Sequence, residues 1–390
     1  MQALRNPLVW QGLIAAVLLV GLISNQPAIA AAVPFAVVAA LLYIGWRVAG
    51  LILARAPARV THGAPDRTPL RTPEIKGDVS GAAVDQPIDP ADMTGYLSSR
   101  VIGQELVAQQ LARGIYRRAA QERRRKPVFT AMLSGPTGTG KTEMAKAIAD
   151  YLFGGGTGLF RVDCANVLGE AGLQTLIGSP KGFAGSGSWG TLTAHLRATP
   201  HTVLLFDEIE KAVTSPTAPM AKLLLSLLDE GICTEQSDGT RLSATDAVII
   251  MTSNAAQERL GQIHQQFRSQ PDQLIRATKD TLRDVFAPEF LARIDLVTAF
   301  APLSQEARAQ IVALQLSRIA ASYGVEVEQV DASFVNQALR LWTTLAGYGT
   351  REVVRWVEQA VADQLIHGKQ QGVTRVRVAW ADDQAVVEPA

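Results

Sequence analysis

The chain has 390 residues, with 37 lysines and arginines against 36 aspartates and glutamates, so its formal net charge is +1. Its two cysteines, Cys164 and Cys233, are too few for a disulfide framework and lack a metal-ligand spacing, so we expect buried, inert thiols. Residues 1–71 carry six arginines and one acid, and the remainder is therefore mildly acidic. Such a body argues against sequence-independent binding of nucleic acid, which needs a concentrated basic surface.

Two apolar runs stand at the start of the chain, Leu8–Ile23 and Ala28–Trp46, with a short uncharged turn between them. At about 1.5 Å per helical residue the second run can cross a bilayer, and the first is slightly short. Arginines precede the first run and follow the second, so the positive-inside rule places both ends in the cytoplasm. We expect a two-helix transmembrane hairpin over residues 1–55, in the bacterial inner membrane.

Two other interpretations of this region remain. Arg5, a short apolar stretch and the small residues Ala28–Ala30 resemble the three parts of a cleaved signal peptide. Alternatively, the runs are core helices of a soluble domain, although they lack a polar face. The second apolar run and the large body behind it disfavour a signal peptide, and the length of both runs disfavours core helices. Residues 56–95 then form a tether rich in proline, glycine and arginine, whose basic first half either lies on anionic lipid or is simply solvated.

A phosphate-binding loop is the most specific signal in the body. The β-prone run Val128–Leu133 leads into a GxxxxGK[ST] segment, and the helix-like Glu143–Tyr151 follows. Glycines let backbone N–H groups surround phosphates, and the helix N-terminus attracts them. The flanking strand and helix disfavour a chance match. The residues expected to bind nucleotide are Gly135, Pro136, Thr137, Gly138, Thr139, Gly140, Lys141 and Thr142. Lys141 would reach the β- and γ-phosphates, and the Thr142 hydroxyl would bind Mg²⁺.

Two further strands end in polar side chains. The apolar run Thr202–Phe206 is followed by Asp207 and Glu208, and the run Ala247–Thr252 is followed by Ser253 and Asn254. Carboxylates are costly beside buried strands, so a chemical role is indicated. We expect Asp207 to hold Mg²⁺, Glu208 to act as general base towards water, and Asn254 to orient that water or the γ-phosphate. The predicted cofactors are ATP and Mg²⁺, and the predicted activity is ATP hydrolysis.

In kind and order these motifs resemble those of AAA+ ATPases of the Clp unfoldase type, in particular the second ATPase module of ClpB and ClpA. The resemblance covers Tyr96–Glu388. It implies an α/β fold, with a P-loop AAA+ parallel sheet flanked by helices over residues 96–302. A small, mainly helical C-terminal lid would occupy residues 303–390.

The same resemblance assigns roles to further residues. Val101 and Ile102 would pack on the adenine, and Arg351 would lie over the phosphates from the lid. Arg293 matches the arginine finger, which would act in trans on a neighbouring subunit of a hexameric ring or spiral. An ion pair of Arg293 with Asp295 or Glu289 is the alternative.

The segment Gly178–Gly185 occupies the place of the family's pore loop. The resemblance implies that four residues contact a polypeptide substrate in the pore: Gly182, Phe183, Ala184 and Gly185. The alternative is that Phe183 anchors the loop to its own core. The basic run Arg123–Lys126 is interpreted as a solvated helix end. No clear tripeptide for docking a ClpP-type peptidase is present, since Leu260–Gln262 has a polar third residue.

The predicted function is therefore a membrane-anchored, ATP-driven protein unfoldase or translocase. It would assemble as a homo-oligomer and thread polypeptide through a pore lined by Phe183. The alternative is a nucleotide-switched scaffold or remodeller of a membrane protein complex, without threading.

Overall fold

The computed structural model describes residues 88–154, 158–182, 187–213, 218–344 and 350–390. The predicted hairpin 1–55, most of the tether 56–95 and the predicted pore residues Phe183, Ala184 and Gly185 lie outside them. Within the described ranges, no helix has both the length and the apolar character needed to span a membrane.

A five-stranded sheet with the order β2-β3-β6-β1-β7 forms the centre of the body, and all its neighbouring strands run parallel. The strands are β1 (Phe129–Ser134), β2 (Leu159–Asp163), β3 (Val203–Asp207), β6 (Val248–Ser253) and β7 (Leu296–Ala299). The predicted strands coincide with β1, β3 and β6, which are buried throughout. Continuous apolar runs are typical of parallel strands covered on both faces.

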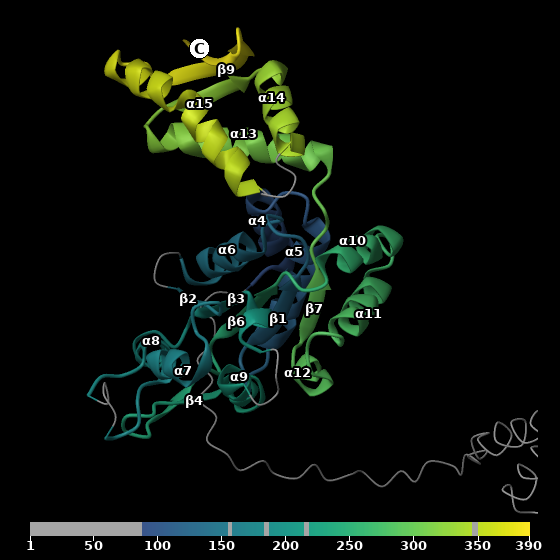
Figure 1. The fold of residues 1–390 in the computed structure, drawn as a ribbon, viewed down its shortest axis with the longest axis vertical. Coiled ribbons are helices and arrows are strands. Elements are labelled where there is room, and N and C mark those ends of the chain that lie inside the picture. The colour runs from purple at the N-terminus through teal and green to yellow at the C-terminus, as the bar shows by residue number, and fades with distance from the viewer. Residues whose placement is uncertain (1–87, 155–157, 183–186, 214–217, 345–349) are drawn as a thin grey trace, which may run out of the picture. The chain divides into compact units, whose positions relative to one another are not determined.

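Helices cover both faces of this sheet (Figure 1). One face packs against α4 (Pro90–Arg100), α5 (Glu105–Ala119) and α6 (Lys141–Phe153). The other packs against α7 (Gly169–Ile177), α8 (Thr191–Ala198), α9 (Pro219–Glu230), α10 (Gln257–Gln266), α11 (Pro271–Leu282) and α12 (Pro288–Ala292). Alternate residues of a strand serve opposite faces, so Leu133 belongs to the first core and Met132 to the second. The α/β class with a flanked parallel sheet is thereby confirmed.

Short elements complete this part of the chain. A 3₁₀ turn, Ile209–Lys211, follows β3 directly. The strands β4 (Ile232–Thr234) and β5 (Arg241–Ser243) form an antiparallel hairpin between α9 and β6. Cys164 and Cys233 are buried free thiols, and burial raises the pKa of each to about 12, so both are inert as expected.

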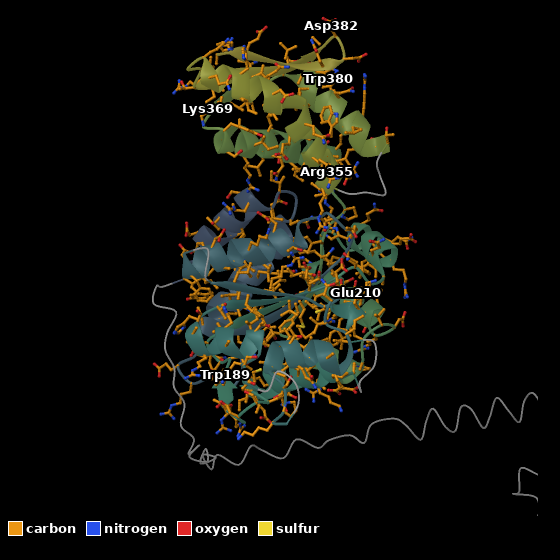
Figure 2. All side chains as sticks on the ribbon, turned by 60° about the vertical axis from the view of Figure 1, so that its left-hand side comes forward. Trp189, Glu210, Arg355, Lys369, Trp380 and Asp382 are labelled. Carbon is orange, nitrogen blue, oxygen red and sulfur yellow. The ribbon has the colours of Figure 1, made fainter. Side chains whose placement is uncertain are left out.

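The C-terminal part builds a core of its own from helices and a small sheet. Its elements are α13 (Gln305–Ser322), β8 (Glu326–Val330), α14 (Ala332–Thr344), α15 (Thr350–Gln370), β9 (Arg375–Ala381) and β10 (Gln384–Pro389). The rings of Phe334, Trp356 and Trp380 form a cluster with centroid separations of 5.3–6.3 Å. Figure 2 labels Trp380 on this sheet. The resemblance implied the mainly helical character of this part, whereas β8 and β10 were not predicted.

One interpretation of the basic run Arg123–Lys126 was wrong. Arg124 is buried, with 8% of its surface exposed. Its guanidinium pairs with Asp246 at 3.2 Å and donates to the carbonyl of Gln121 at 2.8 Å. The other three basic residues are exposed, in agreement with a solvated segment.

Candidate nucleotide-binding site

The turn between β1 and α6 has a backbone that only glycine adopts readily. Gly135, Gly138 and Gly140 have φ values of +133°, +76° and +101°. A Cβ on Gly140 would lie 2.6 Å from Val101 Cγ1, and one on Gly135 would lie 3.0 Å from the Phe300 carbonyl oxygen. Since α6 begins at Lys141, the free N–H groups of its first turn face this loop and favour an anion there.

Lys141 is held inside the loop by backbone oxygens. Its ammonium donates to the carbonyls of Gly135 at 2.8 Å and Pro136 at 2.7 Å. Burial lowers the pKa of Lys141 to about 8, although Glu210, Asp207 and Glu208 oppose that shift. A bound phosphate would supply the close negative charge that the buried ammonium lacks. Gly135 and Pro136 therefore serve the site by holding this lysine.

The polar ends of the central strands meet at Asp207, which is 6% exposed. The Thr142 hydroxyl lies 3.2 Å from Asp207 Oδ1, so the two predicted Mg²⁺ ligands are adjacent. The Thr252 hydroxyl also donates to Asp207, and it accepts a hydrogen bond from the Glu208 backbone at 3.1 Å. Thr252 thus joins both acidic residues, a role that the sequence did not indicate.

Glu208 adopts a left-handed backbone conformation, with φ +55° and ψ +50°. Such strain in a residue other than glycine is typical of functional sites, where surrounding contacts enforce it. Asn254 Nδ2 lies 3.5 Å from Glu208 Oε1, and the Asn254 backbone donates to Glu210 at 3.1 Å. The predicted base and the predicted orienting amide are therefore neighbours.

Arg161 was missed at the sequence level. It lies on β2, whose Asp163 is in register with Asp207, and its guanidinium contacts Asp207 Oδ2 at 2.7 Å. The only signal in the sequence was an arginine within a short strand. That signal does not predict a contact with Asp207 until β2 is known to pair with β3. Arg161 therefore places a positive charge directly beside the predicted Mg²⁺ ligand Asp207.

The oxygens of Thr142 and Asp207 fit Mg²⁺, which prefers hard oxygen ligands and usually keeps water and phosphate in its shell. Across the described part of the chain, no group of three or more His, Cys, Asp or Glu side chains could hold a metal ion. The ion would therefore arrive with the nucleotide phosphates, as it does in other P-loop sites.

A cavity of about 580 Å³ joins these groups, which is within the usual size range of ligand pockets. The predicted residues that line it are Val101, Ile102, Thr137, Gly138, Thr139, Gly140, Lys141, Thr142, Asp207, Glu208, Asn254 and Arg351. The C-terminal part contributes α13 and α15 to the lining, and Thr350 donates a hydrogen bond to the Gly138 carbonyl. Close to Ile102 in the chain, the Gln104 side chain bonds both backbone groups of Ala301, at 2.8 and 3.0 Å.

Arg293 does not line this cavity. Its Nε pairs with Asp229, and Nη1 donates to the Glu289 carbonyl at 2.6 Å. The alternative partner Asp295 is occupied elsewhere, since it pairs with Arg118 and accepts from Thr130 N at 3.0 Å. The predicted alternative of an ion pair with the Asp295 or Glu289 carboxylate was therefore wrong, because Asp229 takes that position.

Comparison with known proteins shows which proteins this chain resembles. Residues 126–297 match the family model described as AAA domain (Cdc48 subfamily). The chain is 35% identical over 283 residues to the chaperone protein ClpB4, mitochondrial, of Arabidopsis thaliana. The aligned region covers 70% of this chain and 28% of that protein. It is 33% identical over 309 residues to the ATP-dependent Clp protease ATP-binding subunit ClpE of Bacillus subtilis, covering 76% and 42%. The chain thus spans less than half the length of these relatives.

The first prediction concerns Glu208. Glu208→Gln removes the general base while keeping the shape, so ATP should still bind while hydrolysis falls by about 100-fold or more. Phosphate release and nucleotide titration measure the two effects separately. Glu258→Gln, an exposed substitution on α10, should leave both unchanged. Ordinary turnover by Glu208→Gln would remove Glu208 from the mechanism.

The second prediction concerns pH. Below pH 8 Lys141 is mostly protonated in the free protein. The negative charge of a bound phosphate would raise the pKa of Lys141 above this value of about 8. Above pH 8 binding must therefore take up a proton, and the apparent affinity for ATP should fall by up to about tenfold per pH unit. Titration of the Glu208→Gln variant between pH 7 and 9.5 measures this slope without hydrolysis. An affinity that stays flat across that range contradicts the assignment.

Proposed function

We propose that this chain, whose ATPase module belongs to the AAA+ proteins of the Clp type, uses ATP hydrolysis to unfold and translocate polypeptide. The observation that carries the proposal is the cavity itself, because one nucleotide site is lined by both the sheet-bearing part and the C-terminal part. A ligand bound there contacts both parts, so a change in the ligand changes the contacts that each part makes.

In the hydrolysis step, Lys141 and the free amides of the P-loop bind the phosphates. Thr142 and Asp207 would hold Mg²⁺, which neutralises phosphate charge when it is bound with ATP. Glu208 accepts a proton from the attacking water, and Asn254 orients that water against the γ-phosphate. The γ-phosphate oxygens are the natural partners of Arg351, which lines the cavity from α15.

The release of the γ-phosphate would then cause movement of the C-terminal lid relative to the sheet-bearing part. Arg351 loses its partner when phosphate leaves, while Thr350 still contacts the P-loop at Gly138. The balance of contacts between the C-terminal lid and the sheet-bearing part therefore differs between the ATP and ADP states. Such a difference in contacts is the source of a nucleotide-dependent conformational change.

We further propose a homo-oligomer, a hexameric ring or spiral, in which Arg293 completes the neighbouring subunit's site. Its position supports this role, because Arg293 lies outside the cavity of its own chain and is 31% exposed. Its ion pair with Asp229 would orient the guanidinium towards the partner. An arginine supplied in trans stabilises the charge of the transferred phosphoryl group.

The proposed substrate is an extended polypeptide, gripped by Phe183 in the loop Gly182–Gly185. An aromatic side chain grips through apolar contact and so needs little sequence selectivity. The name of the Arabidopsis thaliana relative, a chaperone protein, supports a protein substrate. A nucleotide-switched scaffold or remodeller that threads nothing is the competing proposal, and the site chemistry suits it equally.

We also propose that residues 1–55 anchor the ATPase to the bacterial inner membrane, with the body in the cytoplasm. The two apolar runs and the flanking arginines support this proposal, as does the need of the ATPase for cytoplasmic ATP.

The third prediction separates threading from switching. Phe183→Ala should keep basal ATP hydrolysis within about twofold, because it removes a grip and leaves the nucleotide groups intact, and should abolish translocation of an unfolded fluorescent substrate. Lys181→Ala, a neighbouring exposed substitution, serves as the matched control. Unchanged translocation by Phe183→Ala would contradict the assignment of the pore loop.

The fourth prediction concerns anchoring. The full chain should remain in the membrane pellet after extraction at alkaline pH, because two apolar spans are held by the hydrophobic effect rather than by charge. A chain with residues 8–46 deleted should be extracted into the supernatant. Extraction of the full chain would contradict the proposed anchor.

A further inference from the structure

Glu235 is a fully buried carboxylate in the turn of the β4–β5 hairpin, away from the nucleotide cavity. Its oxygens accept hydrogen bonds from Ser237 N at 2.9 Å, from Gly190 N at 3.0 Å and from the Thr193 hydroxyl. Burying a carboxylate without partners is very costly. Burial alone would raise the pKa of Glu235, but these hydrogen bonds outweigh it and lower the pKa, so the group is ionised at neutral pH.

The donors to Glu235 come from two separate places in the chain. Ser237 belongs to the same turn, whereas Gly190 and Thr193 stand at the start of α8. On the other side, Gly178 ends α7, and a Cβ added there would lie 1.7 Å from Glu235 Oε1. The carboxylate therefore lies directly against the Gly178 backbone.

The end of α7 contacts both of these segments beside the carboxylate. Gln236 N donates to the Ile177 carbonyl at 2.7 Å, and the Thr191 hydroxyl donates to the Thr175 carbonyl at 3.1 Å. A Cβ on Gly190 would lie 2.2 Å from the Leu176 carbonyl oxygen. The end of α7 and the start of α8 are thus packed closely together, and the β4–β5 hairpin contacts both of them. Trp189, labelled in Figure 2, packs under the Arg197 guanidinium at 4.5 Å.

We infer that Glu235 is a positioning residue: its carboxylate joins Gly190 at the start of α8 to the β4–β5 hairpin by a hydrogen bond, and it packs against Gly178 at the end of α7, so that both ends of the segment between these helices are held. That hairpin leads directly into β6, whose end carries Thr252 and Asn254 of the nucleotide site. The segment is therefore tied to the strand that carries part of the ATPase chemistry. The consequence for polypeptide handling rests on the proposed function, whereas the positioning itself does not.

Only a carboxylate suits this place. The amide and hydroxyl donors approach both oxygens, Oε1 from Ser237 and Oε2 from Gly190 and Thr193. Glutamine offers one acceptor oxygen and one NH₂ group, so it would set a donor against a donor on one side. A buried donor left without a partner destabilises its surroundings.

The test is amide hydrogen exchange of the full chain carrying Glu235→Gln. Peptides covering the end of α7, the start of α8 and the β4–β5 turn should exchange about tenfold faster, because the amides of Gly190 and Ser237 lose a charged acceptor. Peptides from β1, β3 and α6 should be unchanged, and basal ATP hydrolysis should stay within about twofold. In a translocation assay, the KM for unfolded polypeptide should rise while maximal ATP turnover is kept.

Matched variants test the contact from both sides. Glu230→Gln changes an exposed glutamate at the end of α9, next to the hairpin. Its ion-pair partner, Arg241, is equally exposed, so this substitution should not change the exchange pattern. Gly178→Ala forces a methyl group against the carboxylate and should reproduce the Glu235→Gln exchange pattern. Gly187→Ala, whose Cβ would meet nothing within 4 Å, should not.

Two results would overturn the inference: unchanged exchange in Glu235→Gln, or faster exchange spread evenly over the central strands, which would make Glu235 a general support of the fold. A localised exchange response combined with a wild-type chain that translocates no polypeptide would leave the positioning role intact. That last result would overturn the proposed function instead.

Discussion

The nucleotide site depends on one nearly buried carboxylate, Asp207, which stands at the end of strand β3. Three side chains from three other elements meet it: Thr142 from α6, Thr252 from β6 and Arg161 from β2. Each contact requires a parallel neighbour in register or the helix that follows the P-loop. The parallel sheet is thus the means by which separate sequence motifs share one carboxylate.

The strained backbone at Glu208 follows from the same arrangement. Its N–H is held by Thr252, the residue that also bonds Asp207, so the positions of the two acids are coupled. Strain of this kind persists only where neighbouring contacts enforce it. These contacts hold the sheet side of the site, whereas its other wall comes from the C-terminal lid, which has a hydrophobic core of its own. A site lined from two cores suits the proposed conversion of ligand chemistry into movement.

Glu235 is a second buried carboxylate, and it follows a different rule. Asp207 has a cation, Arg161, beside it, whereas Glu235 is satisfied by neutral donors of the backbone and a hydroxyl. A buried carboxylate paired with an arginine suits a site for Mg²⁺ and phosphate, because the charges around it change when these ligands bind and leave. A buried charge balanced by fixed amides suits architecture, because those donors belong to the chain segments that it joins.

The sequence by itself determined the fold class and most of the nucleotide-binding residues, because both depend on short local patterns. An apolar run followed by GPTGTGKT can only be a strand, a loop and a helix, and the runs before Asp207 and Ser253 predict buried strands in the same way. The mainly helical lid, in contrast, was implied by the resemblance to the Clp family. Short strands with mixed polarity, such as β2 and β8, carry no comparable signal.

Only the tertiary structure decided which side chains meet across the sheet. Arg161 and Thr252 reach Asp207 because of strand order and register, and Arg293 pairs with Asp229 rather than with Asp295, which bonds Arg118 and Thr130. Arg124 is buried because Asp246, far away in sequence, faces it. The role of Glu235 has the same origin, since its two donors at the start of α8, Gly190 and Thr193, lie more than forty residues before it. Local pattern specifies the elements, but pairing of buried charges is specified only when distant segments are brought into contact.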